Sequence, residues 1–135
     1  CELAKEKGAK RAIPLEVSGP FHSSLMEPAA AKLRAVLDQI EINDANVPVI
    51  ANVNAAEMTS AQQIKENLVK QLYSPVLWEN SVQYMLDQGV DTFIEIGPGK
   101  VLSGLIKKVN RRVATYAISD IETLEATIRA IKEGN

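Results

Sequence analysis

The feature that most constrains the fold of this 135-residue chain is the alternation of strand-like and helix-like hydrophobic patterns along almost its whole length. Short β-branched runs are typical of strands, and apolar residues recurring every three or four positions are typical of helices. Strands are expected over 12–17, 47–53, 92–96 and 113–118, with helices between and after them. This order favours a layered α/β fold with a mainly parallel sheet, in which ligands bind beyond the carboxyl ends of the strands.

Local signals place the helix ends. A helix is expected from about 25 to 40, and others begin near 60, 78, 101 and 119. Capping boxes are predicted at Ser24 with Glu27, Ser60 with Gln63, and Ser119 with Glu122, and glycines at 8 and 89 are expected to end helices. The run 47–53 is expected to lead into a turn or hairpin, and 92–96 to be fully buried.

Composition excludes several classes of protein. With 46% apolar and 24% charged residues, the chain is an ordinary globular one, and its net charge of −2 comes from mixed signs, so nucleic acid is not an expected partner. Cys1 is the single cysteine and His22 the single histidine, which leaves no disulfide framework and no zinc ligand set. The sequence lacks an apolar run of about 20 residues, so no membrane association and a cytoplasmic setting are expected.

The chain carries no initiating Met, and residues 1–11 resemble the tail of a helix that stops at Gly8. We therefore expect a C-terminal piece of a larger protein, in which residues 1–11 belong to a neighbouring subdomain. Residues 12–135 contain no repeat or change in composition, and they are expected to form part of one larger domain.

His22 is the leading candidate for chemistry, because it lies between a predicted strand and a predicted helix, where α/β enzymes place reactive groups. An imidazole exchanges protons readily near neutral pH and is the commonest general base. The alternative is a loop or capping histidine. The adjacent Ser23 is better explained by helix entry than as a nucleophile, and the chain has no Gly-x-Ser-x-Gly elbow.

Gln71 is the second unusual residue. Helical spacing puts it beside Ile64 and Leu68, on the stripe expected to face the core, where an amide needs hydrogen-bond partners. One interpretation is that Gln71 lies at the edge of the stripe and reaches solvent or capping groups. The other is that its backbone carbonyl or side chain accepts the His22 Nδ1 proton and fixes the tautomer.

Gly97-Pro-Gly-Lys100 lacks the spacing of a phosphate loop, and a tight turn into a helix is favoured. The start of that helix would still offer free backbone amides and Lys100 to an anionic ligand. Basic pairs occur at 10–11, 107–108 and 111–112, and they are ordinary solvated surface unless the partner is acidic.

Three motifs together resemble one family: SGPFHSSLM at 18–26, VKQLYSPVLW at 69–78 and EIGPGKVL at 95–102. In this order they are similar to the C-terminal part of bacterial malonyl-CoA:acyl carrier protein transacylases, over essentially the whole chain. The resemblance implies an α/β-hydrolase-like acyltransferase fold, with residues 1–11 as the end of a ferredoxin-like subdomain.

By this resemblance, a serine takes malonyl from malonyl-CoA and passes it to the phosphopantetheine thiol of acyl carrier protein, with no further cofactor. His22 matches the family's catalytic histidine, Gln71 the residue whose main-chain carbonyl orients it, and Phe21 a ring that disfavours methylmalonyl. The nucleophilic serine, the carboxylate-binding arginine and an oxyanion-hole glutamine belong to sequence before Cys1, so the chain alone is expected to be inactive. Acyl carrier proteins are acidic, which points to Lys10, Arg11, Lys107 and Lys108 as partner-binding residues.

Two other functions remain open at this point. One is a related acyltransferase, either a polyketide-type domain or the transacylase subunit of malonate decarboxylase. The other is a non-catalytic module that binds an acidic helical partner through its basic residues.

Overall fold

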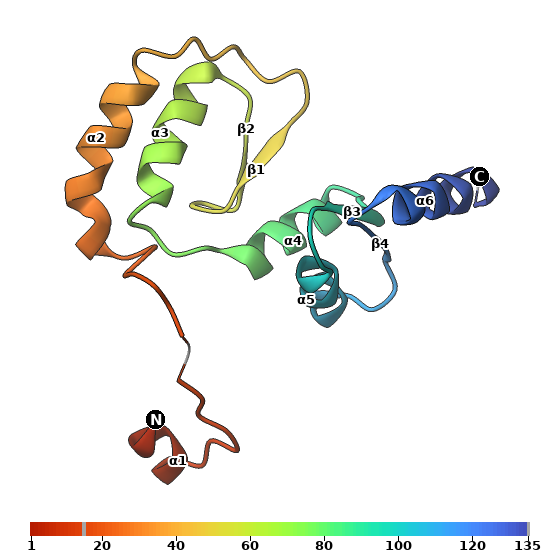
Figure 1. The fold of residues 1–135 in the computed structure, drawn as a ribbon, viewed down its shortest axis with the longest axis horizontal. Coiled ribbons are helices and arrows are strands. Elements are labelled where there is room, and N and C mark those ends of the chain that lie inside the picture. Colours follow the sequence, from red (N-terminus) through yellow and green to blue (C-terminus); the bar gives the residue numbers. More distant parts are fainter. Residues whose placement is uncertain (15, 135) are drawn as a thin grey trace.

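The structure is a computed structural model that describes residues 1–14 and 16–134 (Figure 1). Helices and strands alternate in it along most of the chain. In order they are α1 Glu2–Glu6, the 3₁₀ helix η1 Ser24–Met26, α2 Glu27–Leu37, β1 Val49–Ala51, β2 Ala56–Met58, α3 Ala61–Gln71, α4 Trp78–Asp87, β3 Thr92–Ile96, α5 Val101–Val109, β4 Ala114–Ile118 and α6 Ile121–Glu133.

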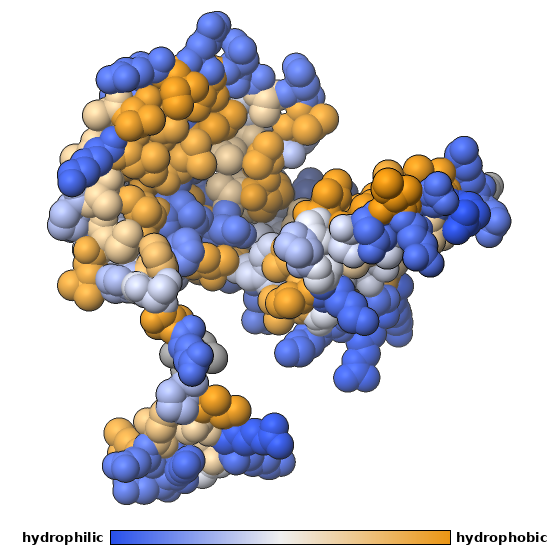
Figure 2. All heavy atoms as spheres, viewed as in Figure 1, coloured by the Kyte–Doolittle hydropathy of each residue, from blue (hydrophilic) through white to orange (hydrophobic). Residues whose placement is uncertain are grey.

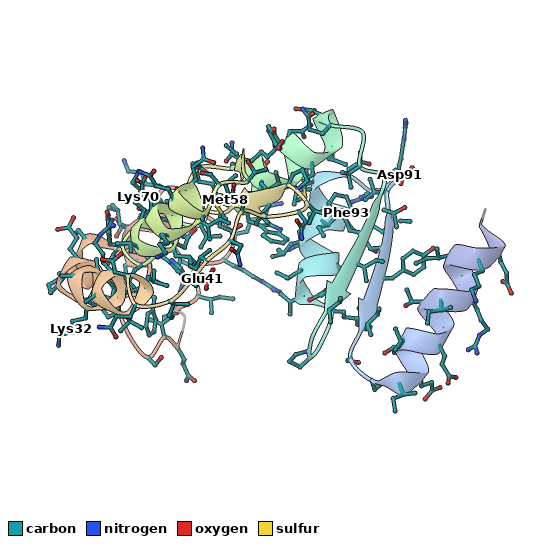
Figure 3. All side chains as sticks on the ribbon, turned by 90° about the horizontal axis from the view of Figure 1, so that it is seen from above. Lys32, Glu41, Met58, Lys70, Asp91 and Phe93 are labelled. Carbon is teal, nitrogen blue, oxygen red and sulfur yellow. The ribbon has the colours of Figure 1, made fainter. Side chains whose placement is uncertain are left out.

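The C-terminal half is a layered α/β unit. β3 and β4 pair in parallel, in register from Thr92 opposite Ala114 to Ile96 opposite Ile118, and α5 connects them. Figure 3 shows α5 and α6 on opposite sides of this strand pair. Parallel strands require a crossover connection, which α5 provides here. The parallel pair with helices on both sides confirms the expected α/β layering.

β1 and β2 form the hairpin that the 47–53 pattern predicted. They pair antiparallel, from Val49 opposite Met58 to Ala51 opposite Ala56. A backbone hydrogen bond joins the hairpin to α4: the Leu77 amide at the start of α4 donates to the Asn52 carbonyl over 2.8 Å. Because α3 leads from the hairpin back toward α4, this bond closes a loop that contains all of α3.

Two clusters of buried side chains hold the fold together. One joins α2 to α3, with Ala30, Leu37 and Val69 buried and Leu72 and Tyr73 packed against them. The other joins α4, β3, α5 and the start of β4, and its buried residues are Val82, Phe93, Ile106 and Val113. Many apolar side chains stay outside both clusters, and Figure 2 shows a broad hydrophobic area over the part of the fold that contains α2 and α3.

The strand predicted over 12–17 is not found in the described residues of that range, and Leu15 lies outside them. Ile13 and Val17 are 68% and 74% exposed. The alternating pattern correctly marks a side that can be buried, but a strand also needs a neighbour for its backbone hydrogen bonds. Within the described residues, neither strand pair extends to this segment.

Two of the three predicted capping boxes are wrong. Ser24 lies within η1, and α2 begins after Met26 with no side-chain cap. The last helix is capped by Asp120 with Thr123, one residue after Ser119, because the Asp120 carboxylate accepts from the Thr123 amide over 2.8 Å. The Ser60–Gln63 box is confirmed, and Gly8 and Gly89 have φ of 92° and 86° just after α1 and α4.

β3 is half-exposed, which corrects the expectation of a fully buried strand. Phe93 is buried, but Ile94 and Ile96 are 45% and 81% exposed on the alternate positions. Period-two alternation puts Phe93 and Glu95 on the α5 side and the two isoleucines on the other. There α6 leaves a hollow lined by Ile94, Tyr116 and Ile131.

In the described part of the chain, no helix is long and apolar enough to cross a membrane.

Candidate active site

His22 lies in the loop before η1 with a left-handed backbone, at φ 59°. This conformation costs an L-residue about 1–2 kcal/mol, and it persists where surrounding contacts determine it. One such contact is the His22 amide, which donates to the Leu72 carbonyl over 3.3 Å. The strained loop is therefore attached to the end of α3.

The His22 ring is hydrogen-bonded to the same end of α3. Its Nδ1 lies 2.9 Å from the main-chain oxygen of Gln71, the last residue of α3. A carbonyl only accepts, so Nδ1 carries the hydrogen and donates it. The last carbonyls of a helix lack partners within the helix, and two of them are used here to position one histidine. His22 is exposed, and its Nε2 is left as the basic atom of the ring.

Ser23 and Phe21 have local roles in this loop. The Ser23 hydroxyl donates to the Pro20 carbonyl over 2.7 Å and so stabilises the turn that contains His22. The Phe21 ring lies over Gly19, where a Cβ would come within 3.1 Å of Phe21 Cε2. Phe21 is 58% exposed beside His22, so its ring forms part of the surface at the site.

Glu95 binds the start of α5, where the sequence predicted free backbone amides that could bind an anionic ligand. Its carboxylate accepts from the amides of Leu102 and Ser103, over 3.1 and 2.8 Å, and from the Ser103 hydroxyl over 2.7 Å. That expectation is therefore corrected at these two amides. The bonds from the Ser103 amide and hydroxyl, and then from the Leu102 amide, lower the pKa of Glu95 and outweigh the opposing effect of desolvation.

We expect Glu95→Gln to destabilise the protein more at pH 7 than at pH 4. A carboxyl group whose pKa is lower in the folded state stabilises the fold above its unfolded value, about 4.3, and this stabilisation is lost as pH falls. Urea unfolding at both pH values measures the difference. Glu125→Gln is the control, because the ion pair of Glu125 with Arg129, at 3.9 Å, is exposed. An equal loss at both pH values for Glu95→Gln would contradict the prediction.

The structure does not gather the four predicted partner-binding residues into one patch. Lys10 and Arg11 are exposed in the segment that follows α1, and Figure 1 shows this segment apart from α5. Lys107 is half-buried, and its ammonium group donates to the carbonyls of Arg111 and Val113. It holds the loop between α5 and β4, whereas Lys108 is exposed.

Sequence reasoning missed Leu72 and Glu95. Leu72 contributes through its main-chain oxygen, which any residue supplies, so its type carries no signal. For Glu95 the sequence did contain a signal: an acidic side chain at the end of a strand, just before a glycine turn into a helix, can bond the first amides of that helix.

No family model matches the sequence.

Known proteins are similar to the chain over nearly its whole length. It is 66% identical over 134 residues to the malonyl CoA-acyl carrier protein transacylase of Bacillus subtilis (strain 168), covering 99% of this chain and 42% of that protein. A transacylase of the same name from Staphylococcus aureus is 56% identical over 124 residues, covering 92% and 40%. By sequence, the chain therefore matches one segment of each of these transacylases.

Solved structures of malonyl transacylases have the same fold. The enzyme of Clostridium perfringens superposes with a TM-score of 0.90 at 45% identity, over 98% of this chain and 42% of that one. A malonyl-transacylase in complex with a type II PKS acyl-carrier protein superposes with a TM-score of 0.89 at 43% identity, over 96% and 42%. The chain thus spans about two fifths of the transacylases that it matches.

Proposed function

We propose that a transacylase containing this segment moves malonyl from malonyl-CoA to the phosphopantetheine thiol of acyl carrier protein, with His22 as general acid and base. The observation that carries the proposal is the 2.9 Å contact between His22 Nδ1 and the Gln71 carbonyl. It leaves the basic Nε2 of an exposed ring for proton transfer. Similarity to named transacylases supports the choice of substrate and partner.

The reaction requires an alcohol from the rest of the longer chain, which we propose to be a serine. Nε2 takes the hydroxyl proton as the serine oxygen bonds to the malonyl carbonyl carbon. The carbon–sulfur bond to coenzyme A then breaks, and Nε2 returns the proton to the leaving thiolate. The second half reverses these steps with the carrier-protein thiol, so no proton or electron is gained or lost overall.

A carbonyl in place of the usual carboxylate suits this exchange. The Gln71 oxygen fixes the ring through Nδ1 but carries no full charge, so it stabilises an imidazolium less than an aspartate would. Acylation expels a thiol, which is a good leaving group, and deacylation expels the serine alkoxide, which takes its proton readily from an imidazolium that is stabilised less and is therefore more acidic. We also assign Phe21 to malonyl selection and the reaction to the cytoplasm. In the domain organisation that we propose, residues 1–11 end a small subdomain and residues 12–135 belong to the large domain.

The direct test is acylation of the full-length transacylase by malonyl-CoA. Mass spectrometry of the quenched protein is expected to show one malonyl group per chain, and added carrier protein is expected to remove it. A non-catalytic module that binds acidic partners would not be acylated. Equal labelling by methylmalonyl-CoA would contradict the role given to Phe21.

We expect charge reversal at Lys10, Arg11 and Lys108 to raise the KM for acyl carrier protein and to weaken its dependence on salt. The carrier protein is acidic, and exposed charges act through steering. Lys107→Glu is tested separately, because it also removes the bonds to the carbonyls of Arg111 and Val113. Hydrolysis of malonyl-enzyme is the control and should not change. An unchanged KM in the triple variant would contradict the partner assignment.

A further inference from the structure

Gln71 offers the same ring nitrogen two opposite partners. Its main-chain oxygen lies 2.9 Å from His22 Nδ1, and its side-chain Nε2 lies 3.4 Å from that atom. A nitrogen that carries hydrogen donates to the oxygen and repels the amide, whereas a bare nitrogen would accept from the amide and repel the oxygen. Each tautomer of His22 therefore has its own partner on one residue.

The amide hydrogens of Gln71 have other acceptors. Nε2 lies 3.3 Å from the Ser74 carbonyl and 3.5 Å from the Pro75 carbonyl, in the turn that follows α3. A flipped amide would bring its oxygen against these two carbonyl oxygens, so the surroundings fix the orientation. The fixed φ of Pro75 makes the turn a stiff anchor.

We infer that the Gln71 side-chain amide is a positioning group: by binding the Ser74 and Pro75 carbonyls, it fixes the last peptide of α3 and thereby selects the His22 tautomer with a bare Nε2. These side-chain bonds span the end of α3, where a helix begins to fray. The Gln71 carbonyl lies at this end, and the bond from His22 Nδ1 depends on the direction in which that carbonyl points. The catalytic consequence rests on the proposed function, whereas the tautomer does not.

The test uses the full-length protein with Gln71→Met, Gln71→Glu and the control Gln62→Met. Gln62 is on the same helix, and its amide donates to Glu66 on the surface. Nitrogen-15 NMR of the His22 ring, assigned with His22→Asn, reports the tautomer of the resting enzyme. The wild type and Gln62→Met should carry the hydrogen on Nδ1. Gln71→Met, which lacks both donors, should shift toward the Nε2–H form.

Kinetics provide the second readout. We expect Gln71→Met to lower kcat about ten- to a hundredfold, with little change in the KM for malonyl-CoA, as for other groups that orient a catalytic side chain. Gln71→Glu cannot bind the two carbonyls, but its carboxylate can accept from Nδ1, so it should keep the Nδ1–H tautomer and lose less activity.

A Gln71→Met protein with the wild-type tautomer and kcat would overturn the inference. If that variant does not fold, the kinetics of Gln71→Glu decide: a kcat below that of the wild type with an unchanged KM for malonyl-CoA supports the inference, because this variant also loses the bonds to the Ser74 and Pro75 carbonyls, and a wild-type kcat overturns it. An absence of malonyl transfer in the wild type would refute the proposed function instead, and the tautomer measurement would still stand.

Discussion

Replacing His22 with alanine is expected to slow malonyl transfer by about two to four powers of ten in the full-length transacylase, the usual contribution of a general base. The exposed ring donates from Nδ1 to the Gln71 carbonyl, at 2.9 Å. Its loss removes the proton acceptor without opening a core. Single-turnover acylation by malonyl-CoA, followed by quenched-flow mass spectrometry, measures the rate of the chemical step.

His22→Gly is the control for backbone strain. The residue has φ 59°, which is unfavourable for alanine, whereas glycine adopts it freely. If the alanine variant were slow because the loop had moved, glycine would restore much of the rate. If the imidazole is the base, both variants are equally impaired. Wild-type acylation in either variant would refute the role of His22.

The sequence predicted those elements whose stability is mostly local. α3 begins after Ser60 because the Ser60–Gln63 capping box satisfies its first amides, and α4 ends before Gly89, whose positive φ suits glycine. The parallel direction of β3 and β4 agrees with the mainly parallel sheet that the alternation of strands and helices predicted. Such signals depend on neighbours in sequence, which a single sequence contains.

The remaining features depend on neighbours in space. The segment 12–17 has the pattern of a strand, yet its described residues form none, because pairing depends on a partner and not on the pattern. The Leu72 main-chain oxygen accepts from the His22 amide over 3.3 Å, across some 50 residues of sequence, and a carbonyl gives no sign in the sequence that it is used in this way. Gln71 combines both interpretations considered from the sequence: its side-chain amide donates to the Ser74 carbonyl after α3, and its main-chain carbonyl accepts from His22 Nδ1.

Phe93→Ala is expected to lower the free energy of unfolding by about 3–5 kcal/mol, the range for removing a large buried aromatic ring. Phe93 lies on β3 (Figure 3) and is 9% exposed. It packs among Val82, Ile106 and Val113, which are 0%, 5% and 6% exposed. These residues come from three other parts of the C-terminal half, so no single one can move in to fill the space. Urea unfolding of the full-length protein measures the loss.

Phe93→Leu is the matched control, because it keeps most of the apolar volume and is expected to cost less than half as much. Folded Phe93→Ala should retain much of its acyl transfer at low temperature, since His22 and Gln71 belong to the α2–α3 side and Phe93 to the other buried cluster. His22→Ala should show the reverse, near-wild-type stability with little activity. Loss of activity in fully folded Phe93→Ala would mean that the two clusters are coupled, and that the end of α3 does not position the histidine by itself.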